Sequence, residues 1–203
     1  MRKLIVMPDD TVEPFLEAIG AASKSLRIKI FSLSDPRVLD ALMKAHKRKV
    51  EIRVLLNPAR HSGEIQNLGS RNVLAEAGID VLDTNPAFAV THEKSLVVDD
   101  SAGWIGSLNW DPDNFEESRD FAVVSTQPDE VAEVIACFEA DWSRQAFEPP
   151  RNLVRPAPRG RKIDFSVDAD SAHDVLPDIF FLRAGRIAAL PWALLVAACH
   201  HYT

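Results

Sequence analysis

Four polar residues in the middle of the chain have the chemistry to attack and hold an oxyanion. His92 and Lys94 lie two residues apart in one strand-like segment, and Ser107 and Asn109 lie two residues apart near the end of another. Residues i and i+2 of a strand point to the same face, so each pair is predicted to project from one side of its strand. An imidazole, an ammonium, a hydroxyl and an amide at neighbouring strand ends would form a cradle for a tetrahedral oxyanion such as phosphate.

Other groups of the same types give weaker signals. Asp99 has the opposite strand parity and is expected to close a turn rather than to take part in chemistry. His46 is expected at a solvated helix end and His61 in an exposed loop that could line a cleft. The two cysteines, Cys137 and Cys199, are too far apart for a zinc-binding spacing, so no metal site is predicted.

The sequence around these groups alternates strand-like with helix-like segments. Short apolar or period-two runs predict strands at residues 4–7, 26–33, 50–56, 80–82, 93–98, 104–108 and 121–125. Helical spacing of apolar residues predicts helices at residues 11–25, 35–47, 63–77 and 129–144. Thr11 is the candidate N-cap of the first helix, and Asp35-Pro36 opens the second. This alternation predicts an α/β fold in which a mixed β-sheet is flanked by helices.

Composition divides the chain into one folded domain and a tail. The 203 residues are 46% hydrophobic, which is enough to bury the core of one ordinary domain. The net charge of −7 divides into −9 for residues 1–149 and +2 for residues 150–203, where seven basic residues outnumber five aspartates. A Pro- and Arg-rich stretch begins near this boundary. The domain is therefore predicted to span residues 1–147, and residues 148–203 to form a poorly ordered linker and tail.

The longest apolar run also lies in the tail. It covers residues 187–199 and contains Pro191, whereas a helix that spans a bilayer needs roughly 20 apolar residues. We therefore expect a cytoplasmic protein that is at most peripheral to the inner face of the membrane.

The spacing of the polar residues is that of a known motif. The pattern HxKxxxxD beginning at His92, followed by GSxN beginning at Gly106, resembles the HKD motif of the phospholipase D superfamily. The resemblance extends over about residues 4–142 and is greatest to bacterial cardiolipin-synthase-like and phospholipase D-like proteins. It implies a phospholipase D-like domain in a single copy.

The resemblance also implies a reaction, which is phosphodiester exchange without a metal or any other cofactor. His92 would attack phosphorus and form a phosphohistidine, dividing one difficult displacement into two. Lys94, Ser107 and Asn109 would hold the non-bridging oxygens of the phosphate as charge develops on them.

Members of this superfamily also place a carboxylate after GSxN, where it holds the histidine in the required orientation. The matching position in this chain is Asp120, which is one methylene shorter than the usual Glu. Glu117 is the substitute candidate. Glu116, Glu117 and Asp120 could equally form a solvated acidic loop.

Superfamily members build the active site from two HKD motifs, in which the second histidine protonates the leaving oxygen. This chain has one, because neither His173 nor His200-His201 begins a second copy. One interpretation is a homodimer in which both His92 residues meet at one phosphate. The alternative is that residues 148–203 are a truncated or frame-shifted second half, which would leave an inactive half-protein that serves only as an interaction domain.

Three function classes therefore remain open. The first is an enzyme of lipid metabolism that hydrolyses or transfers phospholipid headgroups, and the second is a Nuc-like endonuclease acting as a dimer. The third is a catalytically inactive interaction domain. Duplex nucleic acid normally binds a basic face, so the charge of −9 on residues 1–149 disfavours the second class.

Overall fold

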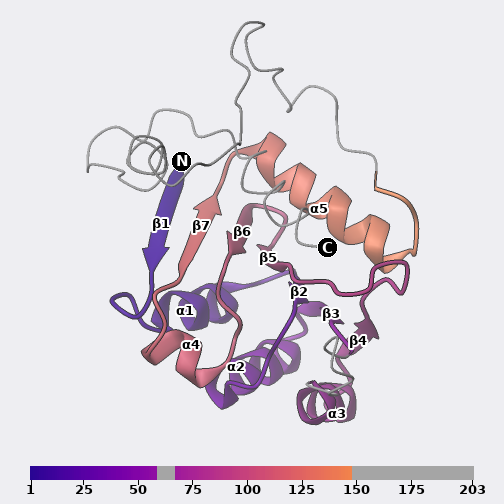
Figure 1. Ribbon diagram of the computed structural model, residues 1–203, viewed down its shortest axis with the longest axis horizontal. Helices are drawn as coiled ribbons and strands as arrows, with labels where there is room; N and C mark the ends of the chain where they lie inside the picture. Colours follow the sequence, from indigo (N-terminus) through magenta and orange to yellow (C-terminus); the bar gives the residue numbers. More distant parts are fainter. Residues whose placement is uncertain (59–66, 148–203) are drawn as a thin grey trace, which may run out of the picture.

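The computed structural model describes residues 1–58 and 67–147, which form one seven-stranded sheet with helices on both faces (Figure 1). The strands are β1 (Arg2–Val6), β2 (Ser25–Ile30), β3 (Glu51–Leu56), β4 (Asp80–Asp83), β5 (Lys94–Val98), β6 (Ala102–Gly106) and β7 (Phe121–Ser125). The helices are α1 (Glu13–Ala21), α2 (Pro36–Lys47), α3 (Leu68–Glu76), α4 (Pro112–Glu116) and α5 (Pro128–Trp142). The predicted α/β class with a mixed sheet is confirmed. The predictions for His61 and for residues 148–203 fall outside the described residues.

The strand order brings several loops to one edge of the sheet. The order is β1-β7-β6-β5-β2-β3-β4, in which β2, β3 and β4 are parallel and all other neighbours are antiparallel. The antiparallel register pairs Ile30, at the end of β2, with Lys94, at the start of β5. Consequently β2, β3 and β6 end where β5 and β7 begin. We call this end of the sheet, which includes Ile30 and Lys94, the His92 edge.

The two faces of the sheet are packed differently. On one face an extensive apolar core includes Phe15 of α1, whose ring centroid lies 4.9 Å from that of Trp104, 5.7 Å from Trp110 and 5.5 Å from Phe115. The other face is covered by α5, which runs across the sheet on the side away from α1 and α2 (Figure 1). A small apolar cluster on this face joins Val97 of β5 and Ile105 of β6 to Val131 and Val134 of α5.

Helix α2 begins at Asp35-Pro36, as the sequence predicted. The buried carboxylate of Asp35 accepts hydrogen bonds from the backbone N–H groups of Arg37 at 2.8 Å and Val38 at 3.4 Å. Pro36 occupies the first helical position, where the missing N–H costs nothing. The side chain of Arg37 pairs with Asp35 and with Glu116 of α4, so the N-terminus of α2 is joined to the loop after β6.

Other boundaries differ from the sequence-based expectation. Helix α1 begins at Glu13 rather than after a Thr11 cap, because Thr11 has a φ of 57° and lies outside the helix. Strand β6 ends at Gly106 instead of continuing to Leu108. Helix α4 was not predicted, since its five residues are too few to show an apolar period. In the part of the chain that the structure describes, no helix combines the length and apolar character needed to cross a bilayer.

Candidate active site

His92 lies directly before β5 at the His92 edge. Its side chain is exposed, but one side of the ring packs on Phe31, with 4.7 Å between the ring centroids and a 59° angle between the planes. Partial burial of the imidazole, together with the nearby ammonium of Lys94, holds the pKa of His92 below its ordinary value of 6.5. A neutral imidazole is therefore favoured at neutral pH, and neutral imidazole is the nucleophilic form.

Lys94 is the first residue of β5 and is almost completely buried. Its Nζ donates a hydrogen bond to the carbonyl oxygen of His92 at 2.7 Å and lies 5.2 Å from the centre of the Phe31 ring. Both motif side chains therefore contact Phe31 from the same side of the strand, as the strand parity predicted.

Two buried asparagines that the sequence analysis did not single out hold the backbone around His92. The side-chain oxygen of Asn57, which follows β3, accepts from the N–H of Thr91 at 3.0 Å. Asn67, next to the start of α3, accepts from the N–H of Leu33 at 3.0 Å. The Asn67 amide also donates to the carbonyl oxygens of Asn57 and Phe31, both at 2.8 Å. A polar residue directly after a buried strand was the available signal for Asn57.

Ser107 and Asn109 lie in the loop after β6 rather than within a strand, so the expectation of a shared strand face does not apply to them. The loop leaves the line of β6 because it is bonded to the segment after β2. The N–H of Trp110 donates to the Ser32 carbonyl at 2.9 Å, and the Trp110 carbonyl accepts from the N–H of Asp35 at 3.0 Å. Within residues 1–58 and 67–147, the buried Oδ1 of Asn109 has no hydrogen-bond partner. An unsatisfied buried acceptor is unusual. Because an amide oxygen can only accept, the side-chain N–H groups of Asn109 are the ones that could donate to a phosphate oxygen.

Asp120 lies beside Ser107. Its carboxylate accepts from the Ser107 hydroxyl at 2.7 Å and from the Asn114 amide at 3.3 Å. Among the described residues no hydrogen bond joins Asp120 to His92, so within one chain this carboxylate orients Ser107. Glu117 is exposed at the end of α4.

Asp99 lies at the opposite end of β5 from His92. Its carboxylate accepts hydrogen bonds from the backbone N–H groups of Ser23, Lys24 and Ser25 at 2.7–3.1 Å and from the Ser23 hydroxyl at 2.8 Å. Burial of the carboxylate would raise its pKa, but these hydrogen bonds outweigh burial and lower the pKa of Asp99 to about 2. Asp99 thus connects the end of β5 to the start of β2. As the sequence predicted, Asp99 also lies in the turn between β5 and β6, where its φ is 52° and the N–H of Ser101 donates to the Val98 carbonyl at 3.0 Å.

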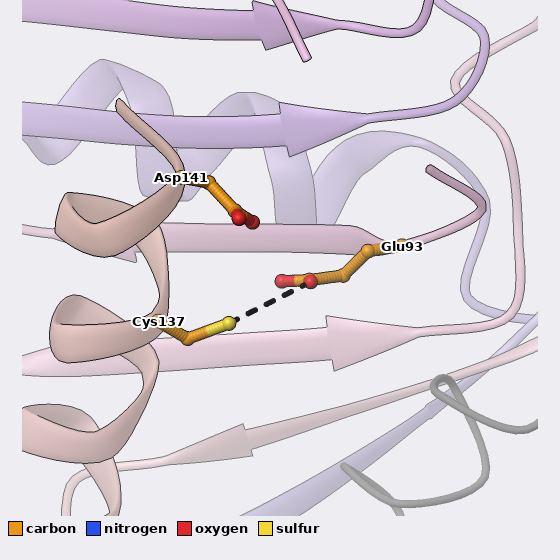
Figure 2. Close-up of side chains that lie close together, drawn as sticks. All are labelled: Glu93, Cys137 and Asp141. Atoms are coloured by element: carbon orange, nitrogen blue, oxygen red, sulfur yellow. Dashed lines mark hydrogen bonds between the residues drawn. The ribbon is translucent and has the colours of Figure 1, made fainter. Parts of the chain in front are cut away.

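One cluster in the described part of the chain has the residue types of a metal site. Glu93, Cys137 and Asp141 bring a carboxylate, a thiol and a second carboxylate within 4.8 Å of one another (Figure 2). The cation position is already filled by a lysine, because the Nζ of Lys29 lies 2.9 Å from Glu93 and 2.5 Å from Asp141. Burial raises the pKa of the Cys137 thiol to about 12, so the thiolate that a metal would require is disfavoured. The cluster is an ion-pair network.

A mixed α/β sheet that presents His92, Lys94 and the GSxN loop at one edge, with Asp99 at the far end of β5, defines a phospholipase D-like domain. Residues 15–142 match the sequence profile of the family described as "Cardiolipin synthase, PLD-like domain", and the chain belongs to this family.

Curated relatives and solved structures agree with this assignment. The chain is 27% identical over 149 residues to the mitochondrial cardiolipin hydrolase of Homo sapiens, covering 70% of this chain and 57% of the hydrolase. It is 32% identical over 134 residues to cardiolipin synthase A of Pseudomonas fluorescens, covering 64% of this chain and 27% of the synthase. The chain thus spans little more than half of one relative and about a quarter of the other.

Among solved structures, the fold is similar to that of Nuc from Salmonella typhimurium, a phospholipase D family member. The TM-score is 0.64 at 22% identity, and the match covers 74% of this chain and 99% of Nuc. NucT from Helicobacter pylori gives a TM-score of 0.62 at 15% identity, covering 73% of this chain and 99% of NucT.

Proposed function

We propose that this chain is a metal-independent phosphodiesterase in which His92 forms a phosphohistidine intermediate. The observation that carries the proposal is the contact of His92 and Lys94 with one ring, that of Phe31, at the edge where the GSxN loop also lies. The lowered pKa of His92 keeps the imidazole neutral, as a nucleophile requires.

In the first step an imidazole nitrogen of His92 bonds to phosphorus, and the bond from phosphorus to the leaving alcohol oxygen breaks. In the second step water or another alcohol attacks the phosphohistidine, which gives hydrolysis or transfer respectively. Lys94, Ser107 and the Asn109 amide would hold the non-bridging oxygens in both steps. Each step displaces one oxygen or nitrogen at phosphorus and needs no redox partner.

The preferred substrate is the headgroup phosphodiester of a phospholipid. The family description and the curated hydrolase and synthase relatives support this choice. The net charge of −9 on residues 1–149 also opposes the binding of a polyanionic duplex. Cleavage of DNA, or no reaction at all, are the other outcomes that the experiment below distinguishes.

A second histidine is needed to protonate the leaving oxygen, and residues 1–203 carry one copy of the motif. We propose that a homodimer supplies it, with both His92 residues at one phosphate. Light scattering is expected to give twice the chain mass at the concentration where activity is measured. A fully active monomer would contradict the dimer.

The function is tested with a substrate panel for the wild type and His92→Ala. The panel contains phosphatidylcholine, phosphatidylglycerol, cardiolipin, single- and double-stranded DNA and bis(p-nitrophenyl) phosphate. We expect release of lipid headgroups and of nitrophenolate by the wild type only, without nicking of DNA. Asn72→Ala, at an exposed position on α3, is the control for the effect of substitution itself. Activity that survives in His92→Ala would remove His92 from the mechanism.

A further inference from the structure

Glu93 stands between the two motif residues and points to the other side of the strand. His92 and Lys94 contact Phe31, whereas the Glu93 carboxylate accepts from the Ser95 hydroxyl at 2.8 Å on the face covered by α5. The alternation of side chains along a strand explains the difference. Because Glu93 is joined to His92 and Lys94 through the backbone, any movement of Glu93 moves both of them.

A buried ammonium holds the Glu93 carboxylate in place. Lys29 of β2 is fully buried, and its Nζ lies 2.9 Å from Glu93 Oε2 and 2.5 Å from Asp141 Oδ2. The same Nζ lies 3.3 Å from Cys137 Sγ. Figure 2 shows Glu93 reaching from the segment before β5 toward Cys137 and Asp141, which project from α5. The cluster therefore ties the motif segment to both β2 and α5.

The buried ammonium of Lys29 requires counter-charges close to it, and this requirement restricts where the carboxylates of the cluster can lie. Burial alone would lower the pKa of Lys29, but the interactions with Glu93, Cys137 and Asp141 outweigh burial and hold the pKa above its usual range. A buried charge is tolerated only where counter-charges and hydrogen bonds satisfy it. Lys29 therefore fixes the Glu93 carboxylate, because departure of that carboxylate would leave the ammonium with one counter-charge fewer.

We propose that Glu93, held by Lys29 and Asp141, is a positioning residue that sets the backbone between His92 and Lys94 for catalysis. This inference rests on the phosphodiesterase function proposed above. Glu93 faces away from the phosphate-binding side, so it acts through its neighbours and makes no contact with substrate. Displacing a reacting group by about 1 Å can cost about 100-fold in rate. In metal sites, loss of an outer-shell partner that orients a ligand typically costs 10- to 100-fold, and we expect a cost of the same order here.

The test compares Glu93→Gln with a matched control, Glu130→Gln. Glu130 is a buried residue in the first turn of α5, and it pairs with Arg2 and accepts from Ser125, far along the sheet from His92. Both variants remove one buried carboxylate charge without changing its shape. With bis(p-nitrophenyl) phosphate, we expect Glu93→Gln to lower kcat about 10- to 100-fold with KM within about twofold of the wild type. Glu130→Gln is expected to leave kcat within about twofold.

A second readout does not depend on turnover. The imidazole signals of His92, assigned by NMR from their loss in His92→Ala, should broaden or shift in Glu93→Gln and stay unchanged in Glu130→Gln. If the wild type cleaves no phosphodiester, the proposed function fails, while the NMR comparison still tests the positioning role. Unchanged kcat and unchanged His92 signals in Glu93→Gln would overturn the inference, as would equal effects in both variants.

A triple variant without charges in the cluster tests whether a loss of activity is only a loss of folding. Lys29→Met, Glu93→Met and Asp141→Leu together replace every charge of the cluster by an apolar side chain of similar size, and such a replacement of a buried ion cluster is often possible without loss of stability. We expect this variant to unfold at a temperature close to that of the wild type and to lose kcat as Glu93→Gln does. Wild-type kcat and His92 signals in the folded triple variant would refute the positioning role.

Discussion

The hydroxyl of Ser107 lies 2.7 Å from a carboxylate oxygen of Asp120 and also accepts a hydrogen bond from the N–H of Phe121 at 3.1 Å. Ser107, the residue directly after β6, is thereby fixed by the residues at the start of β7. The geometry gives Asp120 the role of holding the Ser107 side chain within its own chain, which differs from the role that the motif resemblance implied. The single hydrogen of the hydroxyl is donated to Asp120, so it must turn to a phosphate oxygen when substrate binds. The two roles predict different pH profiles.

Asp120→Ala removes the carboxylate that holds the Ser107 side chain, so the hydroxyl loses its fixed position. We expect kcat/KM for bis(p-nitrophenyl) phosphate to fall about tenfold or more, since loss of an orienting partner typically costs 10- to 100-fold. The acid limb of the pH profile should stay where it is, because Asp120 does not contact His92. Asp113→Ala, an exposed carboxylate in the neighbouring helix α4, is the control. A shifted acid limb in Asp120→Ala would show that Asp120 acts on the histidine.

The pH dependence should report the environment of His92. Because burial of the ring and the Lys94 charge lower the pKa of His92, the neutral form and hence kcat/KM should persist below pH 6.5. Phe31→Ala exposes the imidazole ring of His92, so the pKa of His92 should rise toward 6.5 and the acid limb of the pH profile should move to higher pH. The measurement is kcat/KM against pH, with NMR titration of His92 in parallel.

The control for Phe31→Ala is Phe121→Ala, which removes a partly exposed ring at the same edge. It should leave the acid limb unchanged. An acid limb that moves to lower pH in Phe31→Ala would contradict the burial argument.

Asn67→Ala should destabilise the domain. The Asn67 amide satisfies three backbone groups of Phe31, Leu33 and Asn57, and all three would lose this partner. Each buried polar group left unsatisfied costs about 1–3 kcal/mol, so we expect a total loss of about 2–4 kcal/mol after local relaxation. Urea unfolding measures the loss. The matched substitution Asn72→Ala, at an exposed position of α3, should change the free energy of unfolding by less than about 0.5 kcal/mol.

Asp99→Asn should affect stability and leave kcat unaltered. The folded-state pKa of Asp99 is lowered from 3.8 to about 2, so its ionised form stabilises the fold above pH 3.8 and that contribution is lost as pH falls toward 2. We expect the variant to be about 1–2 kcal/mol less stable at pH 7. The difference from the wild type should shrink between pH 4 and pH 2. A stability difference that does not depend on pH, or a large loss of kcat, would contradict the structural role.

Strong local signals made much of the scaffold predictable. Asp35-Pro36 carries the cap of α2, and the apolar run at residues 121–125 matches β7. The β6 boundary was missed because Ser107 and Leu108 continue the alternation of the strand. The deviation there depends on bonds of Ser107 to Asp120 and of Trp110 to Ser32, which are distant in sequence.

In the site, too, only the features that depend on neighbouring residues could be predicted from the sequence. Strand parity predicted that His92 and Lys94 share a side, since parity is a local property. Nothing in the period-two pattern of residues 26–33 indicates that Lys29 is buried, and its burial depends on α5 folding over that face. The partners of Lys29 lie 64 and 112 residues further along the chain. No pattern within a single segment could indicate such a network.

The central claim is that the His92 imidazole becomes covalently bonded to phosphorus. The direct test is a rapid-quench experiment with excess bis(p-nitrophenyl) phosphate, followed by peptide mass spectrometry at alkaline pH, where phosphohistidine survives. The account predicts a burst of nitrophenolate in proportion to the active sites and a nitrophenylphosphoryl adduct on His92, both absent in His92→Ala. An adduct on another residue, or turnover by His92→Ala at the wild-type rate, would contradict it.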